Sequence, residues 1–200
     1  QSGDAKRALS LSQEAAVTAP DEPAVLDLLG RSQVAAGEMQ QALATYGKLA
    51  ARVPSSPIPL IAMADLMMSS KDTAGAEQNL RKALAIKPDS LEAQQRLVAI
   101  LLNDKRGDAA IAIAKDVQRQ RKDSSIGYIL EAESLLSIGK RPEAVKVYEE
   151  AYRREKSAAS ILRLHNAHLA ATQPQEAAKL AADWIKANPK DLTVRTYLAE

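Results

Sequence analysis

A fixed interval of 34 residues runs through this 200-residue sequence. Prolines mark the interval three times, at Pro20, Pro54 and Pro88. Alanine recurs at the same interval without a gap, at Ala8, Ala42, Ala76, Ala110 and Ala144. The next copy is one residue shorter, because Ala177 follows after 33 residues and brings Pro189 into the proline positions. A constant period of this length is typical of proteins built from stacked supersecondary units.

Each unit contains two predicted helices. Apolar residues of the first helix recur at i, i+3, i+4 and i+7, which places them on one face, as at Leu60, Met63, Ala64 and Met67. A helix breaker follows near the middle of each unit, at Gly37, Lys71 with Asp72, Gly107, Gly139, and Thr172 with Pro174. The second helix carries the alanine positions and is expected to end at the proline, which cannot donate a hydrogen bond to the preceding turn. Capping residues are expected at the next helix start, at Asp21, Ser56, Asp89, Asp123 and Ser157.

These units predict a single all-α solenoid over residues 1–200. Its five full repeats span residues 23–56, 57–90, 91–124, 125–157 and 158–190. Residues 1–22 would form only the second helix of a truncated repeat, and residues 191–200 only the first helix of another, so we expect a piece of a longer chain. Small or compact residues of the first helices would let helix axes approach closely, at Gly30, Ala64, Val98 and Ala132.

Composition agrees with helices and excludes several classes of partner. Apolar residues make up 46% of the chain and aromatic residues only 3%, which favours closely packed helices over sheets. Twenty-seven basic and 25 acidic residues give a net charge of +2, so no basic field for nucleic acid is present. The absence of cysteine excludes disulfides and thiolate metal sites. No apolar run approaches the roughly 18 residues of a membrane span, so direct membrane insertion by these residues is not expected.

The repeat pattern resembles the tetratricopeptide repeat family. Residues 28–54, LLGRSQVAAGEMQQALATYGKLAARVP, carry the Leu-Gly pair, the central Gly, the Ala, the aromatic residue and the closing Pro of that motif. The sequence departs from the motif at Gln33, where a large apolar residue is usual, and at Glu131. It also departs at Lys122 and Lys156, where Pro is expected. The resemblance implies a right-handed superhelix of helical hairpins whose concave groove binds peptides or proteins.

No group of residues forms a recognisable catalytic site. His165 and His168 are the only histidines, and their spacing on one predicted helix could offer two metal ligands. No third ligand is evident, and both positions fall among the packing positions of the repeat, so we favour packing over metal binding. The basic clusters at residues 119–122 and 153–156 lie at helix ends, where they complement the helix dipole. We therefore predict no enzymatic activity, no cofactor and no metal.

The remaining candidate site is the groove formed by the first helices. Its residues lie about 100° from the packing stripe and form an apolar floor with acidic spots, which suits a helical or extended peptide. They are Asp27, Arg31, Ile61, Asp65, Met68, Gln95, Leu102, Ile129, Glu133, Leu136, Leu162 and Asn166. Met68, Leu102 and Leu136 could equally be buried between repeats. Ile61, Ile129 and Leu162 share one position in three repeats, and we expect them to be exposed anchors for a partner.

A narrower resemblance concerns the C-terminal part. Residues 164–200, LHNAHLAATQPQEAAKLAADWIKANPKDLTVRTYLAE, look like the last repeats of tetratricopeptide lipoproteins of bacterial exosortase (PEP-CTERM) protein-sorting and exopolysaccharide systems. The resemblance implies a scaffold in the periplasm or at the outer membrane, held by a lipid anchor outside these residues. The alternatives are the recruiting arm of a larger enzyme and a cytoplasmic assembly or regulatory scaffold. Truncated repeats at both ends would also allow copies to associate end to end.

Overall fold

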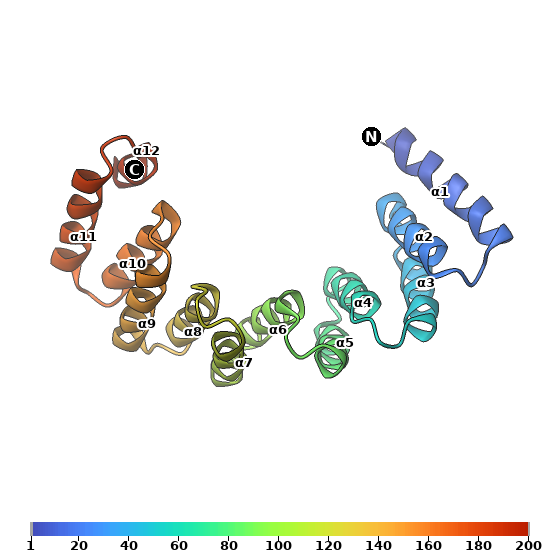
Figure 1. The fold of residues 1–200 in the computed structure, drawn as a ribbon, viewed down its shortest axis with the longest axis horizontal. Coiled ribbons are helices and arrows are strands. Elements are labelled where there is room, and N and C mark those ends of the chain that lie inside the picture. Colours follow the sequence, from blue (N-terminus) through green and yellow to red (C-terminus); the bar gives the residue numbers. More distant parts are fainter. Residues whose placement is uncertain (1, 200) are drawn as a thin grey trace. The chain divides into compact units, whose positions relative to one another are not determined.

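The computed structural model describes residues 2–199, which form twelve α-helices and no strand (Figure 1). The helices are α1 (Ser2–Thr18), α2 (Pro23–Ala36), α3 (Met39–Arg52), α4 (Ile58–Ser69), α5 (Thr73–Ile86), α6 (Leu91–Asn103), α7 (Gly107–Gln120), α8 (Ile126–Ser137), α9 (Arg141–Arg154), α10 (Ala158–Ala170), α11 (Pro174–Ala187) and α12 (Leu192–Ala199). Within this described part, no helix is both long and apolar enough to cross a bilayer.

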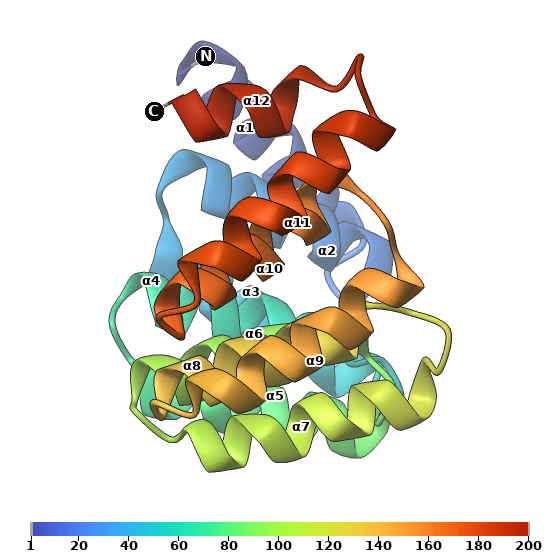
Figure 2. The same ribbon diagram turned by 90° about the vertical axis from the view of Figure 1, so that its left-hand side faces the viewer.

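The chain divides into two compact units, residues 1–97 and 98–200, with the boundary inside α6. In the first unit α2 packs on α3 and α4 packs on α5, and Figure 1 shows each pair side by side. In the second unit α8 packs on α9 and α10 on α11, while α12 contacts both α10 and α11. Figure 2 views this unit from the side of α9 and α11, with α10 behind α11. Each unit therefore consists of consecutive helical hairpins.

The turn inside each hairpin contains one residue in the left-handed backbone conformation. These residues are Gly37 (φ 82°), Lys71 (φ 64°), Lys105 (φ 58°), Gly139 (φ 78°) and Thr172 (φ 58°). Glycine adopts this conformation without steric cost, which explains its use at two of the five turns. The expected breaker Gly107 is wrong, because Gly107 is the first residue of α7. A Cβ atom there would lie 2.3 Å from the Ile138 Cγ2 atom, so Gly107 allows α7 to approach α8.

The second helices end at the same repeat position whether or not proline follows. α7 and α9 end before Arg121 and Glu155, and Lys122 and Lys156 stand where other repeats have proline. Arg121 has φ −132° and ψ 66°, close to φ −125° and ψ 64° at Val53, which precedes Pro54. In both cases the backbone N–H of this residue donates to the carbonyl four residues earlier. Proline is compatible with this helix end and is not its cause.

Side-chain capping follows the sequence prediction most fully at Ser157. The Ser157 hydroxyl accepts a hydrogen bond from the Ser160 backbone N–H at 3.2 Å, and the Ser160 side chain completes a capping box. Asp21 instead pairs with Arg52 at 2.5 Å. The N-cap residues are Pro57 for α4 and Ser125 for α8, and neither side chain makes a capping hydrogen bond. At the start of α6, Ser90 accepts from the Ala93 N–H. The Ser56 hydroxyl accepts from the backbone N–H of Ile58, the first residue of α4, at 3.4 Å. The capping predictions for Asp21 and Asp123 were wrong.

A large side chain meets a small one where the two helices of a repeat cross. The ring of Tyr46 lies so close to Gly30 that a Cβ atom on Gly30 would be 2.9 Å from the Tyr46 Cζ atom. The same two positions hold Ala64 and Leu80 in the next repeat, and Ala132 and Tyr148 in a later one. In the last full repeat the sizes are reversed, with His165 at the small position and Ala181 at the large one. All of these side chains are buried.

Polar departures from the repeat motif are matched by polar partners. Gln33 is buried at an apolar position, and its Oε1 atom accepts a hydrogen bond from the Thr45 hydroxyl at 2.8 Å. Glu131 is partly buried, and its Oε2 atom accepts from the Gln118 side-chain amide at 2.6 Å. Lys115 lies 3.7 Å from the same carboxylate. Since a buried polar group without a partner is costly, each pair lets the repeat keep an unusual residue.

Gly30→Ala tests the size pairing at the helix crossing. The substitution gains helix propensity, yet the new methyl group meets the Tyr46 ring, so we expect a net destabilisation of about 1 kcal/mol. In a Tyr46→Leu background, the same Gly30→Ala change should be stabilising, because it recreates the pair found at Ala64 and Leu80. Urea unfolding midpoints of the four proteins measure both effects. Stabilisation by Gly30→Ala in both backgrounds would show that the ring does not limit this position.

Candidate functional site

The groove face of the first unit contains a weak ion pair and a small apolar cavity. Arg31 and Asp27 on α2 are 3.8 Å apart, and both side chains are exposed to solvent. A cavity of about 200 Å³ lies between α2, α3 and α4, and its apolar lining includes Val34, Met39 and Leu66. Asp65 and Ser69 line it as well, and Tyr46 contributes to its wall. The cavity is large enough for one apolar side chain beside a carboxylate.

Ile61 is buried, with 4% of its surface exposed, so its expected role as an exposed anchor is wrong. Helix α4 is apolar on nearly every side, with Asp65 as its only charged residue. A helical wheel of such a helix does not show which apolar side faces solvent. Ile58 is the exposed isoleucine of this helix, at 62%, and Met68 is exposed at 37%. Gln95 on α6 is exposed, whereas Leu102 is partly buried.

Asp65 is held by a residue of the next repeat. The Arg96 Nε and Nη2 atoms donate to its two carboxylate oxygens at 2.6 and 2.9 Å, which is a bidentate contact. Arg96 also pairs with Glu92 at 3.0 Å. In the second unit Asn166 accepts a hydrogen bond from the hydroxyl of Tyr197, again 31 residues later. The sequence analysis missed Arg96 and Tyr197, although a search for polar pairs at this interval could have found them.

Glu133 is the acidic residue of the groove face in the second unit. It lies on α8 between Ile129 and Leu136, which are partly buried and pack against the core of this unit. Within the described residues, the Glu133 carboxylate makes no ion pair or hydrogen bond. Arg163 on α10 influences it only through its charge. Glu133 is therefore a partly buried carboxylate in an apolar setting.

Burial raises the pKa of the Glu133 carboxyl above its usual value, and the positive charge of Arg163 lowers it in part. Tyr148 lies near the same carboxylate. Burial, and secondarily the charge of Glu133, raise the pKa of Tyr148 to about 12. Tyr46 occupies the same repeat position, and its pKa is raised by burial and by the charge of Asp27. Each tyrosine thus reaches from the second helix to an acidic residue of the groove face.

A further cavity of about 530 Å³ lies between α10 and α12. Leu162 lines it from α10, and Leu192, Thr196 and Tyr197 line it from α12. Leu162 is partly buried, while Leu192 is 67% exposed. This hollow places an expected groove residue, Leu162, beside an exposed leucine that the sequence analysis did not single out.

The two histidines are buried at packing positions. His168 Nδ1 lies 2.8 Å from the Gln173 Oε1 atom, and the His165 ring stacks edge-on against Tyr197 with centroids 5.8 Å apart. Burial and the neighbouring His168 lower the pKa of His165. The described residues contain no group of three or more His, Cys, Asp or Glu side chains that could hold a metal ion. The burial of both rings supports the packing interpretation.

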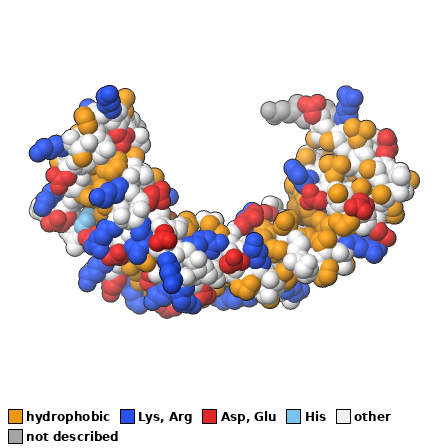
Figure 3. All heavy atoms as spheres, viewed as in Figure 1, with side chains coloured by type: hydrophobic (Ala, Val, Ile, Leu, Met, Phe, Trp, Pro, Cys, Tyr) orange, Lys and Arg blue, Asp and Glu red, His pale blue; other side chains and the backbone are white. Residues whose placement is uncertain are grey.

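Charged side chains are distributed differently over the two units. The face seen in Figure 3 carries hydrophobic side chains over much of the first unit, and a denser mixture of basic and acidic side chains over the second.

Comparisons with known proteins find similar helical repeats. The tetratricopeptide repeat family model matches residues 67–133. Among solved structures, MamA from Desulfovibrio magneticus RS-1 is 17% identical with a TM-score of 0.68, covering 86% of this chain and 98% of that one. YrrB, described as a protein with an unusual peptide-binding site, is 12% identical with a TM-score of 0.63, covering 94% of this chain and 98% of that one.

PilF from Pseudomonas aeruginosa is 17% identical with a TM-score of 0.66, covering 98% of this chain and 90% of that one. A comparison with curated protein sequences gives no significant match. At these identities the structural similarities show the fold alone. They confirm the predicted all-α solenoid of tetratricopeptide helical hairpins.

Glu133→Gln tests the electrostatics of the groove face. The pKa of this carboxyl is higher in the folded protein than in the unfolded chain, where it is about 4.3. Its contribution to stability is therefore fully present below the pKa of the unfolded chain, and it is lost as pH rises through the pKa of the folded protein. The variant should therefore be more stable than wild type at pH 7. The gain should be no more than about 1 kcal/mol, since the Glu133 carboxyl keeps part of its solvation. Thermal unfolding from pH 3 to pH 8 measures the difference.

The advantage of Glu133→Gln should disappear near pH 4 and below, where the wild-type carboxyl is protonated. Glu143→Gln, at an exposed position of α9, controls for the substitution itself. A stability difference that is the same at pH 4 and pH 7 would show that burial does not perturb Glu133.

Proposed function

We propose that this chain, a tetratricopeptide repeat protein by fold, is a non-enzymatic scaffold whose groove face binds a protein segment with a basic side chain between apolar ones. A repeat scaffold of this fold is suited to protein–protein interaction. The observation that carries the finer proposal is Glu133, a partly buried carboxylate without an ion pair within the described residues. Burying a charge without a partner is unfavourable, so a cationic ligand group would relieve a cost that the free protein carries.

The contact between Asp65 and Arg96 supports the geometry of this recognition. Asp65 occupies the position in its repeat that Glu133 occupies two repeats later. At Asp65, an arginine from the next repeat supplies two hydrogen bonds. At Glu133, the nearby Arg163 supplies none, so the carboxylate oxygens remain available to a guanidinium or ammonium group of a ligand.

Apolar surface on both sides of Glu133 would contact the neighbouring ligand residues. Ile129 and Leu136 stand one helical turn before and after it on α8. Leu162 on α10 lines the hollow that continues to α12. A short segment with alternating apolar and basic residues therefore matches the floor in polarity. The peptide-binding site named for YrrB supports a peptide as the general kind of ligand.

The resemblance of residues 164–200 to exosortase-associated lipoproteins supports a cellular setting for this scaffold. We place the intact protein in a bacterial system for protein sorting and exopolysaccharide export. There it would be exported and held in the periplasm or at the outer membrane by a lipid anchor outside these residues. Metabolic labelling of the intact protein with a tagged fatty acid, together with cell fractionation, tests this setting. An unlabelled protein in the cytoplasmic fraction would contradict it and support the cytoplasmic scaffold.

A peptide array tests the proposed ligand chemistry. The array presents short peptides with a fixed apolar–X–apolar core, where X is Lys, Arg, Gln or Glu. We expect Lys and Arg peptides to bind about 10- to 100-fold more tightly than Gln peptides, the range of a charge-assisted hydrogen bond. Glu133→Gln should remove this preference, whereas Glu143→Gln should keep it. A preference for basic peptides that survives Glu133→Gln would exclude Glu133 as the recognition group.

A further inference from the structure

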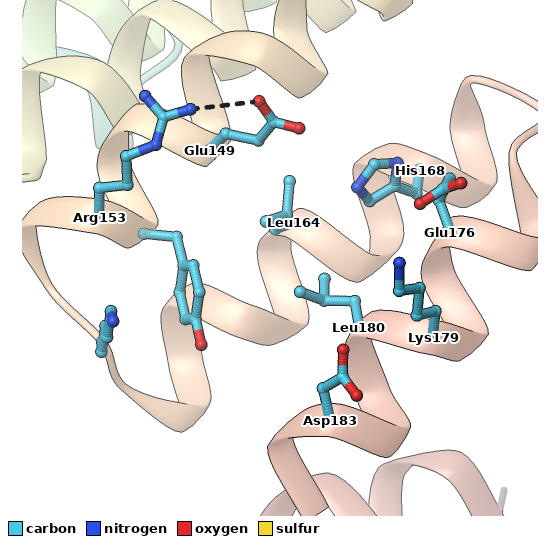
Figure 4. A pocket seen from close by; sticks show the side chains of 10 residues that line it. Glu149, Arg153, Leu164, His168, Glu176, Lys179, Leu180 and Asp183 are labelled. Atoms are coloured by element: carbon cyan, nitrogen blue, oxygen red, sulfur yellow. Dashed lines mark ion pairs between the residues drawn. The ribbon is translucent and has the colours of Figure 1, made fainter. Parts of the chain in front are cut away.

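A second groove lies on the opposite side of α10 from the groove face. Its first part is a cavity of about 430 Å³ between α9, α10 and α11, shown in Figure 4. Leu164 and His168 line it from α10, whereas the groove-face residues of this helix are Leu162 and Asn166. Residues two apart on a helix point in nearly opposite directions, so the two surfaces are separated by the helix itself.

A neighbouring cavity of about 450 Å³ extends this groove along α11. The two cavities share four lining residues, Tyr152, Lys156, Leu180 and Asp183. From Glu176 at one end to Ala187 at the other, the groove follows α11 for about 16 Å, which is three helical turns. We call this combined hollow the second-helix groove, because α9 and α11 are second helices of consecutive repeats.

The floor of the second-helix groove is apolar and partly aromatic. Leu164 and Leu180 point into its middle in Figure 4. Tyr152 and Trp184 add two rings whose centroids are 6.2 Å apart and tilted by 59°. The indole N–H of Trp184 donates to the Asp191 carboxylate at 2.8 Å, which fixes the ring. Tyrosine and tryptophan in such positions are frequent anchors of protein interfaces.

The section shared by the two cavities carries one cation and one anion, whereas the α11 wall beyond this section also carries Glu176 and Lys179. Arg153 on α9 pairs with Glu149 and Glu150, whereas Lys156 follows two residues after the end of this helix. Asp183 on α11 lines the shared section together with Lys156. Within the described residues, neither Lys156 nor Asp183 makes an ion pair or hydrogen bond. The shared section thus presents Tyr152 and Leu180 between a free cation and a free anion.

We propose that the second-helix groove binds an amphipathic α-helix of a partner protein. The apolar stripe of this helix lies on Tyr152 and Leu180, its acidic edge faces Lys156, two residues after the end of α9, and its basic edge faces Asp183 on α11. The length of three turns and the apolar floor between two parallel helical walls fit a helix. The cation and the anion of the shared section fix its orientation by complementarity. This surface is separate from the groove face and does not depend on Glu133.

The probe is a fluorescein-labelled synthetic helix of three to four turns with leucines along one face, glutamates along one edge and lysines along the other. A second peptide of the same composition has the two charged edges exchanged. Fluorescence anisotropy with the 200-residue chain should show binding of the first peptide, and about tenfold weaker binding of the second. Lys156→Glu combined with Asp183→Lys should reverse this preference. Both positions are exposed, so the fold is retained.

Lys146→Glu, at an exposed position of α9 outside both cavities, is the matched control and should leave the preference unchanged. Three results would overturn the proposal. The first is the absence of binding, or equal binding of both peptides. The second is an equal loss of preference in the Lys146→Glu control. The third is self-association of the wild-type chain in sedimentation that Lys156→Glu abolishes, because a second copy would then be the occupant.

Discussion

The structure depends on the limited space between the two helices of a repeat at the point where they cross, which side chains from both helices must fill together. Protein interiors are close-packed, so a large side chain from one helix requires a small one from the other. Tyr46 lies against Gly30, and Tyr148 shares a core cluster with Ala132. Because each ring passes a small residue of the first helix, its phenol comes close to Asp27 or Glu133 on the groove face. The packing rule of the repeat thereby shapes the electrostatics of the candidate site.

The acidic residues of the groove face differ in whether an arginine of the next repeat donates hydrogen bonds to them. Arg96 reaches Asp65 with two hydrogen bonds, whereas Arg163 acts on Glu133 only through its charge. A small difference in side-chain placement therefore turns a structural contact into a potential recognition site. On the other side of α10, Lys156 and Asp183 line the same cavity, and within the described residues neither has an ion-pair partner. Recognition in both places would rest on charges that the fold leaves without a partner.

Much of the fold was predictable, because a period of 34 residues reports packing contacts that recur in every repeat. The helix ends were less predictable, since α7 and α9 end without the proline that marks other repeats. The site was predicted only in part. Ile61 was expected to be exposed and is buried, because α4 is apolar on nearly all sides and its pattern has no polar face. The contacts of Arg96 and Tyr197 join repeats, which an analysis of single helices does not consider.

The matched sizes at the helix crossing also determine which pieces of this gene can be exchanged. The large and small residues of a pair lie in the same hairpin, as with Gly30 and Tyr46, or His165 and Ala181. Recombination between hairpins moves both members together and preserves the match. Recombination within the turn would join His165 to a tyrosine or leucine, or Gly30 to Ala181, and leave an overfilled or empty crossing. The complete hairpin is therefore the smallest segment that evolution or protein engineering can duplicate, delete or transfer without repacking the core.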